Sequence, residues 1–474
     1  MNDGLWTMDD GRWTMVTLIT DQIEFKLNAP GPNHRVVKLD YPGFHPGPNP
    51  SKAELFNIKI MKELKTIGQK AKQASKLFRN ESSIKKDLAL ELAAKNLVKN
   101  TDKILSANKR DLESATINGL KGAILDRLKL TDARIQDIAE GLSQIVSLDD
   151  PVGEIISMKQ RPNGLKIGQK RVAIGVIGMI YESRPNVTAD VFGLCIKTGN
   201  VIILRGGKEA FHSNLAIVNI LRESLKEAGL PEDAVQLIQN TSRESAVALM
   251  KMNDYLDLLI PRGGAGLIQS VVMNSTVPVI ETGVGNCHIY VDEFADPQKA
   301  VEIVFNAKTH RPGVCNAAES FLIHSKVAEK LLPQIASKLH EKDVEIRGDK
   351  KVCEIVDFAI PAAEEDWGME YLDYIISAKI VDSLEEAIEH IEKYGTMHSE
   401  AIITENYTHA QKFLDEVDSA AVYVNASTRF TDGFEFGFGA EIGISTQKLH
   451  ARGPMGLKEL TTTKYIIYGN GQIR

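Results

Sequence analysis

The stretch THRPGVCNAAES places Cys315, one of four cysteines in 474 residues, between a Pro-Gly turn and an asparagine. Such a turn can present the sulfur to a cleft and let the amide of Cys315 serve as an oxyanion donor. An ordinary thiol has a pKa of about 8.5, so a nucleophilic cysteine needs positive charge nearby, and Arg311 is close in sequence. A cysteine nucleophile is therefore one hypothesis. The other, a small buried side chain, describes Cys195 well and Cys315 poorly, because polar residues and glycine surround Cys315.

Two glycine-containing segments follow apolar runs and carry cations. In IPRGGAG, Arg262, Gly263 and Gly264 end a predicted strand and open a helix, where backbone amides and the helix dipole could bind a phosphate. In ILRGGKEA, Arg205 and Lys208 could bind an adenosine ribose with a 2′-phosphate. Packing glycines and a solvated turn are the alternatives. The ordinary dinucleotide fingerprint GxGxxG is absent after the first strand.

Two further segments supply carboxylate or cation chemistry. Glu281 closes the run VPVIE, where burial would raise the pKa of its carboxyl toward the acid–base range, although most such acids only cap a loop. The stretch NASTRFTDGFEFGFGAEIG contains polar side chains and Arg429 among glycines. It could hold a substrate carboxylate, or it could simply form a glycine-rich hairpin loop.

The elements that must position these residues follow from hydrophobic periodicity. From Ile60 a 4-3-4-3-4 spacing of apolar residues predicts a helix, and SSIKKDLALELAAKNLVKN predicts a second one. Residues 151–171 contain a Pro-Asn-Gly turn and suggest a hairpin, and TTTKYIIYG suggests a final strand. Apolar runs that alternate with amphipathic helices predict parallel, doubly wound sheets, in which ligands bind at the carboxyl ends of strands. These runs are VAIGVIGMIY, NVIILRG, AVQLI, LDLLI, VPVIE, CHIYVD, SFLIH, YIISAKIV, EAIITE and AAVYVN.

Composition narrows the class of protein. Apolar residues are 43% and charged residues 25%, which is ordinary for a globular protein of this length with at least two domains. A formal charge of −7 gives no electrostatic case for nucleic acid or a membrane surface. We expect no membrane span, no secretory signal and no metal site, because apolar runs are short, acids stand near the N-terminus and no zinc-ligand spacing occurs. A reduced, cytoplasmic chain fits best.

Together these segments resemble the aldehyde dehydrogenase superfamily and, within it, the γ-glutamyl phosphate reductase family. The resemblance covers about Met61 to Arg474 and is carried by GMIYESRPNVTADV, LIPRGGAGLI, VIETGVGNCHIYVD, KTHRPGVCNAAES, VNASTRFTDGFEFGFGAEIGIST and KLHARGPMGL. It implies an α/β fold with a Rossmann-type NADP-binding domain (58–150 and 172–286), an α/β catalytic domain (287–447) and a β oligomerisation element (151–171 and 448–474). Residues 1–57 have no counterpart, and they are either a flexible extension or an artefact upstream of Met61.

The resemblance also implies an activity. The family reduces γ-glutamyl phosphate with NADPH to glutamate 5-semialdehyde and phosphate, the second step of proline biosynthesis. Cys315 would attack the acyl carbon and form a thioester. The acyl phosphate would come from a separate glutamate 5-kinase, because residues 1–57 are too short to be one. The enzyme would be a homodimer or homotetramer. The rivals are a hydrolytic aldehyde dehydrogenase and a non-catalytic family member that binds nucleotide.

Residue by residue, the resemblance assigns further roles. For the oxyanion donor, Arg184 ranks ahead of Asn186 in ESRPN, and Arg184 would also neutralise the acyl phosphate. Glu281 matches the base that activates water in oxidising members, so in a reductase it would handle protons or only hold its loop. The remaining assignments are Arg205 and Lys208 for the adenosine ribose of NADP, Glu370 for the nicotinamide ribose, and Arg311, Asn316, Ser427, Thr428 and Arg429 for the substrate.

Overall fold

The computed structural model describes residues 5–9, 12–19, 22–26, 36–38, 52–121 and 123–474, and the chain divides into two compact units, Met1–Ile58 and Lys59–Arg474. The first unit contains one antiparallel sheet of β1 (Leu5–Asp9), β2 (Arg12–Ile19), β3 (Gln22–Lys26) and β4 (Val36–Lys38) in that order. The predicted proline-rich linker YPGFHPGPNPS lies outside the described residues.

Helices precede the first parallel sheet. They are α1 (Lys52–Phe78), α2 (Ser83–Lys99), α3 (Thr101–Ile117), α4 (Ala123–Leu128) and α5 (Asp132–Ser147). Helix α1 begins eight residues before the predicted start at Ile60, because the preceding KAELFNIK has neither glycine nor proline to end it. The serine predicted to start the second helix caps it, since the Ser82 side chain accepts the amide of Lys85.

A four-stranded parallel sheet follows, in the order β10-β7-β8-β9. Its elements are β7 (Val176–Tyr181), α6 (Asn186–Lys197), β8 (Val201–Gly206), α7 (Phe211–Glu227), β9 (Val235–Leu237), α8 (Arg243–Leu249), β10 (Leu258–Arg262) and α9 (Ala265–Asn274). The parallel arrangement was predicted, and every residue of β7 is buried, as expected for a strand covered on both faces. The predicted strand VPVIE was wrong: it contributes only a bridge between Val279 and Leu259, since the proline before Val279 has no amide hydrogen for a ladder.

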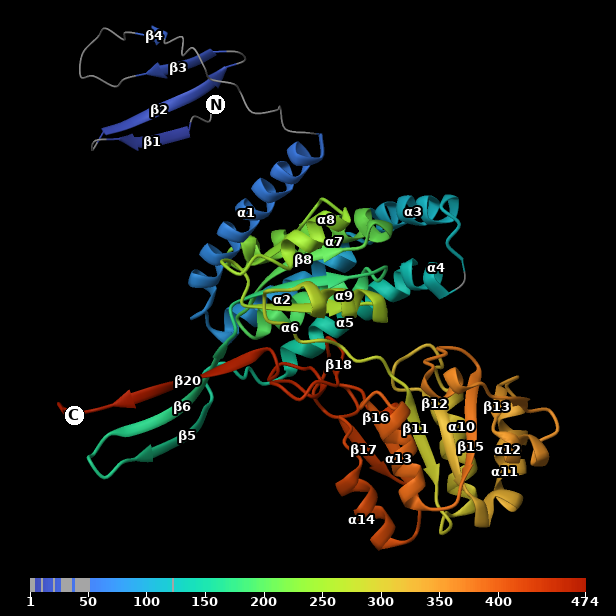
Figure 1. Ribbon diagram of the computed structural model, residues 1–474. Coiled ribbons are helices and arrows are strands. Elements are labelled where there is room, and N and C mark those ends of the chain that lie inside the picture. The colour runs from blue at the N-terminus through green and yellow to red at the C-terminus, as the bar shows by residue number, and fades with distance from the viewer. Residues whose placement is uncertain (1–4, 10–11, 20–21, 27–35, 39–51, 122) are drawn as a thin grey trace. The chain divides into compact units, whose positions relative to one another are not determined.

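A seven-stranded parallel sheet occupies the C-terminal half, in the order β14-β13-β15-β12-β11-β16-β17 (Figure 1). Its strands are β11 (Cys287–Val291), β12 (Ala318–His324), β13 (Glu345–Gly348), β14 (Ile360–Pro361), β15 (Ile375–Val381), β16 (Ser399–Ile403) and β17 (Ala421–Val424). Ile289 and Phe321 pack in one apolar cluster, whereas Tyr290 and Leu322 pack in another, so both faces are covered. Its helices are α10 (Pro297–Thr309), α11 (Ser325–His340), α12 (Lys350–Ile355), α13 (Leu384–Tyr394) and α14 (Tyr407–Glu416).

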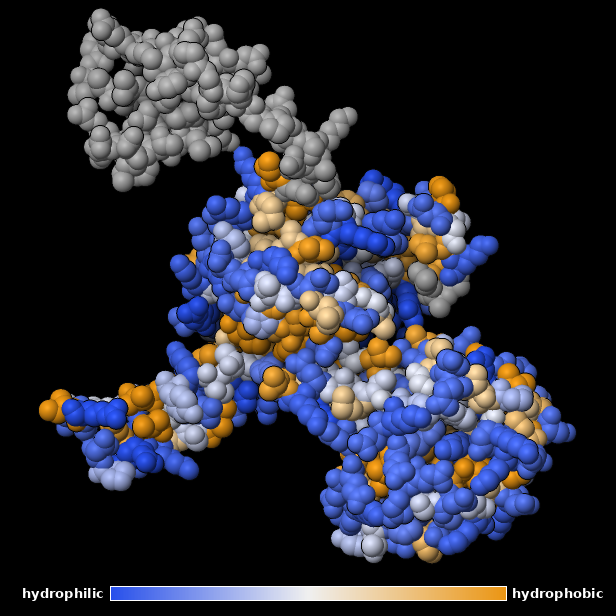
Figure 2. Space-filling model, in the orientation of Figure 1, coloured by the Kyte–Doolittle hydropathy of each residue, from blue (hydrophilic) through white to orange (hydrophobic). Residues whose placement is uncertain are grey.

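The predicted hairpin is confirmed as β5 (Ile155–Gln160) and β6 (Lys166–Ala173), and the predicted final strand is β20 (Thr461–Tyr468). β20 pairs antiparallel with β6, which gives a three-stranded sheet. Hydrophobic residues lie on its surface (Figure 2), and Tyr465 and Ile467 are 71% and 60% exposed. Among the described helices, none is both long and apolar enough to cross a membrane.

Candidate active site

Cys315 lines a cavity of about 410 Å³ in the Lys59–Arg474 unit. Six of the residues predicted from the sequence line this same cavity, although they come from four separate segments of the chain. They are Arg184, Arg262, Gly263, Gly264, Cys315 and Glu370. The structure therefore brings together the predicted nucleophile, the first-ranked oxyanion donor and the glycine pair at a helix start.

The two parallel sheets meet the cavity with opposite ends. Arg262 is the last residue of β10, and Arg184 follows β7, so the four-stranded sheet contributes its carboxyl edge, as predicted. Cys315 instead precedes β12, so the seven-stranded sheet contributes its amino edge. The cavity thus meets this sheet at the end opposite to the carboxyl ends where ligands were expected, because residues of both sheets line it.

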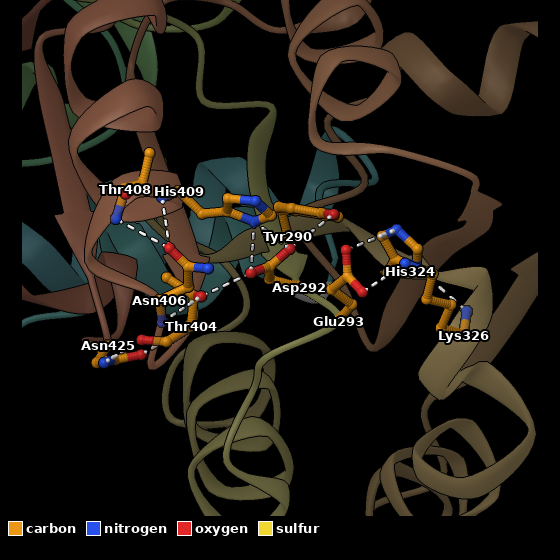
Figure 3. A network of polar contacts seen from close by, with 10 residues as sticks. All are labelled: Tyr290, Asp292, Glu293, His324, Lys326, Thr404, Asn406, Thr408, His409 and Asn425. Carbon is orange, nitrogen blue, oxygen red and sulfur yellow. Dashed lines mark hydrogen bonds and ion pairs between the residues drawn. The ribbon is translucent and has the colours of Figure 1, made fainter.

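The carboxyl edge of the seven-stranded sheet carries a polar network instead (Figure 3). Buried Asp292, just after β11, accepts hydrogen bonds from Thr404 at 2.6 Å and Tyr290 at 3.2 Å, and lies 2.9 Å from the ring Nδ1 of His409. This network joins the ends of β11 and β16 to the start of α14. It contains none of the residues that line the cavity around Cys315.

Backbone contacts fix the position of the Cys315 loop. The Sγ of buried Cys287 donates to the carbonyl of Cys315 at 3.2 Å. A Cβ atom at Gly285 would overlap this same carbonyl oxygen, so only glycine fits there without a shift of the loop. The Gly285 amide donates to Glu370 Oε1 at 2.7 Å, which ties the Glu370 carboxylate to the segment just before β11 that backs the cysteine.

Burial dominates the protonation of the predicted nucleophile. It raises the pKa of the half-buried Cys315 thiol, and the negative charges of Glu441 and Glu370 act in the same direction. The guanidinium of Arg262 lowers that pKa. Arg262 on β10 thus has the largest opposing effect, and Arg184 and Arg429 also interact with the charge of Cys315. The sequence neighbour Arg311 had been expected to supply this positive charge.

The two oxyanion candidates differ in position. Arg184 lines the cavity, and burial together with the nearby Arg262 and Arg127 lowers its pKa to about 10. Asn186 does not line the cavity, and its side-chain amide donates to the carboxylate of Asp190 at 2.9 Å. The local geometry favours Arg184.

The predicted cofactor residues fall into two groups. At the start of α9, the amide of Gly264 donates to Glu182 Oε2 at 3.0 Å, so an anionic oxygen already occupies this helix N-terminus. Such a site fits a phosphate oxygen. Arg205 lies outside the cavity and donates to the carbonyls of Thr241 and Ser242 at 2.6 and 2.8 Å, whereas Lys208 lies outside it and is exposed.

The predicted substrate residues form a second layer around Cys315. The side chain of buried Asn316 donates to the carbonyl of Thr431 at 2.9 Å, and Thr428 Oγ1 donates to the carbonyl of Asn316 at 2.8 Å. Both therefore join the cysteine loop to the 427–431 loop. Burial lowers the pKa of half-buried Arg429, and the nearby cation Arg311 lowers it further.

Ser427 and Glu281 make local contacts as well. The Ser427 hydroxyl accepts the amide of Arg429 at 3.3 Å. The Glu281 amide donates to the side chain of Gln447 at 2.9 Å, and Glu281 does not line the cavity. Of the predicted catalytic residues, Cys315 and Arg184 therefore line the cavity, whereas Glu281 and Asn186 do not.

The aldehyde dehydrogenase family model matches residues 59–353 of the chain. The chain belongs to the aldehyde dehydrogenase family. A gamma-glutamyl phosphate reductase from Clostridium botulinum (strain Eklund 17B / Type B) is 63% identical over 414 residues, covering 87% of this chain and 100% of that protein. One from Caldicellulosiruptor saccharolyticus is 62% identical over 418 residues, with the same coverage of both.

Solved structures agree with this membership. The crystal structure of gamma-glutamyl phosphate reductase from Thermotoga maritima matches with a TM-score of 0.85 and 52% identity, covering 87% of this chain and 100% of that one. An acetylating aldehyde dehydrogenase from Geobacillus thermoglucosidasius shares the fold, with a TM-score of 0.65 and 17% identity. The aldehyde dehydrogenase-like α/β fold implied by the sequence resemblance is confirmed.

Sequence reasoning missed several residues that line this cavity or affect Cys315. Arg127, Glu182 and Glu209 line the cavity, and Glu441 lies close enough to Cys315 to raise its thiol pKa. Burial raises the pKa of Glu441 itself to about 7. Glu182 and Glu209 follow the carboxyl ends of β7 and β8, so their position was a usable signal. Arg127 lies in a short helix far from any predicted strand end and gave no such signal.

Among the described residues, no group of His, Cys, Asp or Glu side chains could hold a metal ion.

Proposed function

We propose that this chain is an NADPH-dependent γ-glutamyl phosphate reductase, which converts L-glutamate 5-phosphate to L-glutamate 5-semialdehyde and phosphate in the second step of proline biosynthesis. The observation that carries the proposal is Cys315 in one cavity with Arg184 and Arg262, whose guanidinium groups have no ion-pair partner among the described residues. A thiol beside free cations suits an anionic acyl donor. The high identity to named reductases supports the same activity.

Cys315 is the nucleophile of this proposal. Its sulfur loses the thiol proton, attacks the acyl carbon and forms a thioester as the C–O bond to phosphate breaks. The guanidinium of Arg184 neutralises charge on the reacting acyl phosphate, and the fixed loop behind Cys315 holds the sulfur in line with the acyl carbon. When bound, the nicotinamide cofactor supplies the hydride that reduces the thioester. The resulting thiohemiacetal then collapses, which frees the aldehyde and the sulfur.

The cofactor is a nicotinamide dinucleotide, as the family implies. We propose NADP because exposed Lys208 after β8 supplies a cation where a ribose 2′-phosphate needs one, and Arg205 lies beside it. Gly263 and Gly264 at the start of α9 would bind a phosphate of the cofactor. This phosphate would replace the Glu182 carboxylate that accepts the Gly264 amide. Glu370 would orient the nicotinamide ribose from the cavity wall.

The substrate carboxylate is assigned to Arg429, with Arg311 beside it, because Arg429 is close enough to interact with the charge of Cys315 and Arg311 is close enough to interact with Arg429. Asn316, Ser427 and Thr428 hold this loop rather than catalyse. A separate glutamate 5-kinase would supply the acyl phosphate. The exposed apolar side chains of the β5-β6-β20 sheet would join subunits of a cytoplasmic homodimer or homotetramer.

The test follows NADP reduction from pyrroline-5-carboxylate, with and without inorganic phosphate, for the wild type and Cys315→Ala. We expect phosphate-dependent reduction in the wild type and a loss of at least about 1,000-fold in the variant, since nucleophile removal eliminates the covalent route. Reduction that is independent of phosphate would contradict the proposal and favour a hydrolytic aldehyde dehydrogenase.

A further inference from the structure

Three guanidinium groups line the cavity that contains Cys315: those of Arg127, Arg184 and Arg262. None of them makes a hydrogen bond or an ion pair with another described residue. Arginine remains charged at neutral pH, so the cavity holds three positive charges without a direct ion-pair partner, and the carboxylates of Glu182, Glu209 and Glu370 line it as well. Guanidinium groups without a direct partner suit an anion that enters the cavity.

The three charges are close enough to act on one another. After burial, the largest causes that lower the pKa of Arg184 to about 10 are the charges of Arg262 and then Arg127. None of the three carboxylates in the cavity wall, Glu182, Glu209 and Glu370, forms an ion pair with these guanidinium groups, and Glu182 and Glu370 accept the amides of Gly264 and Gly285 instead. An entering anion would be stabilised by all three cations at once.

Arg127 is held in place by its neighbours in the sequence. Adjacent Leu128 is buried in a small apolar cluster with Ala115 and Ala210. The side chain of buried Asn108 donates to the carbonyl of Leu128 at 2.8 Å, and its Oδ1 accepts the amide of Leu130 at 2.8 Å. These contacts anchor the end of α4, so that Arg127 is presented to the cavity by a fixed backbone.

We propose that Arg127 binds the phosphate group of the acyl phosphate and the inorganic phosphate released from it, which rests on the proposed function. A guanidinium can donate two parallel hydrogen bonds to phosphate oxygens. Arg127 belongs to the helical region before the β5-β6 hairpin, so this segment contributes to the substrate site as well as to the fold. The cofactor also carries phosphates, and the experiment distinguishes these two sources.

The experiment measures KM for phosphate and KM for NADP in the oxidation of pyrroline-5-carboxylate. We expect Arg127→Met to raise KM for phosphate by about 10-fold or more, because hydrogen bonds between two charged groups are lost, and to leave KM for NADP within about 2-fold. The KM for phosphate of Arg127→Lys should lie between those of the wild type and Arg127→Met, because lysine keeps the positive charge but cannot donate two parallel hydrogen bonds from one planar group. Arg110→Met, at an exposed position on α3, is the matched control and should behave as the wild type.

A second measurement needs no turnover. Inorganic phosphate bound beside Cys315 adds negative charge there and should slow alkylation of the thiol by iodoacetate in the wild type but much less in Arg127→Met. An unchanged phosphate KM and unchanged protection in Arg127→Met would overturn the inference while leaving the reductase intact. A rise in KM for NADP alone would assign Arg127 to the cofactor and also overturn it. A wild type without phosphate dependence would instead refute the proposed function, and the inference with it.

Discussion

The four-stranded and seven-stranded sheets contribute differently to the same cavity. The four-stranded sheet presents its carboxyl edge, with Arg184 and Arg262, whereas the seven-stranded sheet presents its amino edge, with Gly285 and Cys315. Carboxyl edges of parallel sheets lead into helix N-termini and so favour anions. The amino edge does not lead into helix N-termini, and the charge of Arg262 at the other edge lowers the pKa of the Cys315 thiol there.

The residues that pack behind the two sheet edges also differ in polarity. Behind Arg262, β7 and β10 are almost wholly apolar and buried. Behind Cys315 lies a buried polar layer in which Lys308 contacts Glu319 at 2.5 Å, with both side chains fully buried. Glu319 also accepts the amide of Leu372 at 3.1 Å, close to the Glu370 segment. We therefore expect the amino edge to be far more sensitive to single substitutions.

The largest effect is expected for Gly285→Ala. Its Cβ atom would overlap the Cys315 carbonyl, so the cysteine loop must move, and displacement of reacting groups by about 1 Å costs roughly 100-fold in rate. The measurement is turnover with pyrroline-5-carboxylate, NADP and phosphate. Gly266→Ala in α9 is the control, because a Cβ atom there meets nothing within 4 Å. Equal activity of both variants would show that the amino edge tolerates movement.

The next effect is on stability. Lys308→Met leaves Glu319 buried without its cation, and loss of one partner of a buried pair typically costs about 3–5 kcal/mol. Burial raises the pKa of Glu319 to about 7, against the opposing effect of Lys308. A carboxyl with a raised folded pKa favours the fold at low pH, and this contribution is lost as pH rises through the folded value. The free energy of unfolding in urea should therefore fall more steeply with pH in the variant than in the wild type.

Lys338→Met is the control for that measurement, since the Lys338 side chain is 41% exposed, pairs with Glu341 three residues later and lies over the ring of Phe305. It should change the free energy of unfolding by less than about 1 kcal/mol. The double variant Lys308→Met with Glu319→Gln should recover part of the loss. If Lys308→Met and Lys338→Met have equal free energies of unfolding, the amino edge is not more sensitive to single substitutions than expected for the surface.

A moderate effect on the KM for NADP is expected from a substitution at the carboxyl edge of the four-stranded sheet. Lys208→Glu reverses the charge after β8 and should raise KM for NADP by about 10-fold, equivalent to roughly 1.4 kcal/mol, while leaving the alkylation rate of Cys315 unchanged. Lys226→Glu, exposed on α7, is the charge-matched control. Unchanged KM for NADP would exclude Lys208 from cofactor binding.

The smallest effect concerns the thiol itself. The negative charge of Glu441 raises the pKa of Cys315, so Glu441→Gln should lower that pKa and move the alkylation profile to lower pH by less than about 1 unit. The shift should be fully developed only above pH 7, because the pKa of Glu441 is itself raised to about 7 and the carboxyl is neutral at lower pH. Glu435→Gln, exposed on the same loop, should leave the profile in place. A shift toward higher pH would contradict the assigned direction.

Local sequence patterns predicted the candidate site residues better than the positions that these residues take in the fold. Cys315 and the Arg262 segment were identified because polar residues, cations and glycines stand next to apolar runs. Strands β13 and β14 were missed because they are short and carry exposed or charged residues. Arg127 could not be found, since only the folded chain brings α4 to the cavity. The meeting of opposite sheet edges likewise depends on distances between segments, which periodicity does not contain.

The pairing of β6 with β20 has a consequence for synthesis of the chain. The side chains of Gln169 and Thr463, which join these strands at 2.9 Å, are 294 residues apart in the sequence. The β5-β6 hairpin therefore leaves the ribosome long before its third strand exists, and the free edge of β6 is open to pairing with other chains during that interval. Loop closure over so many residues is slow, so completion of this sheet is a late event in folding.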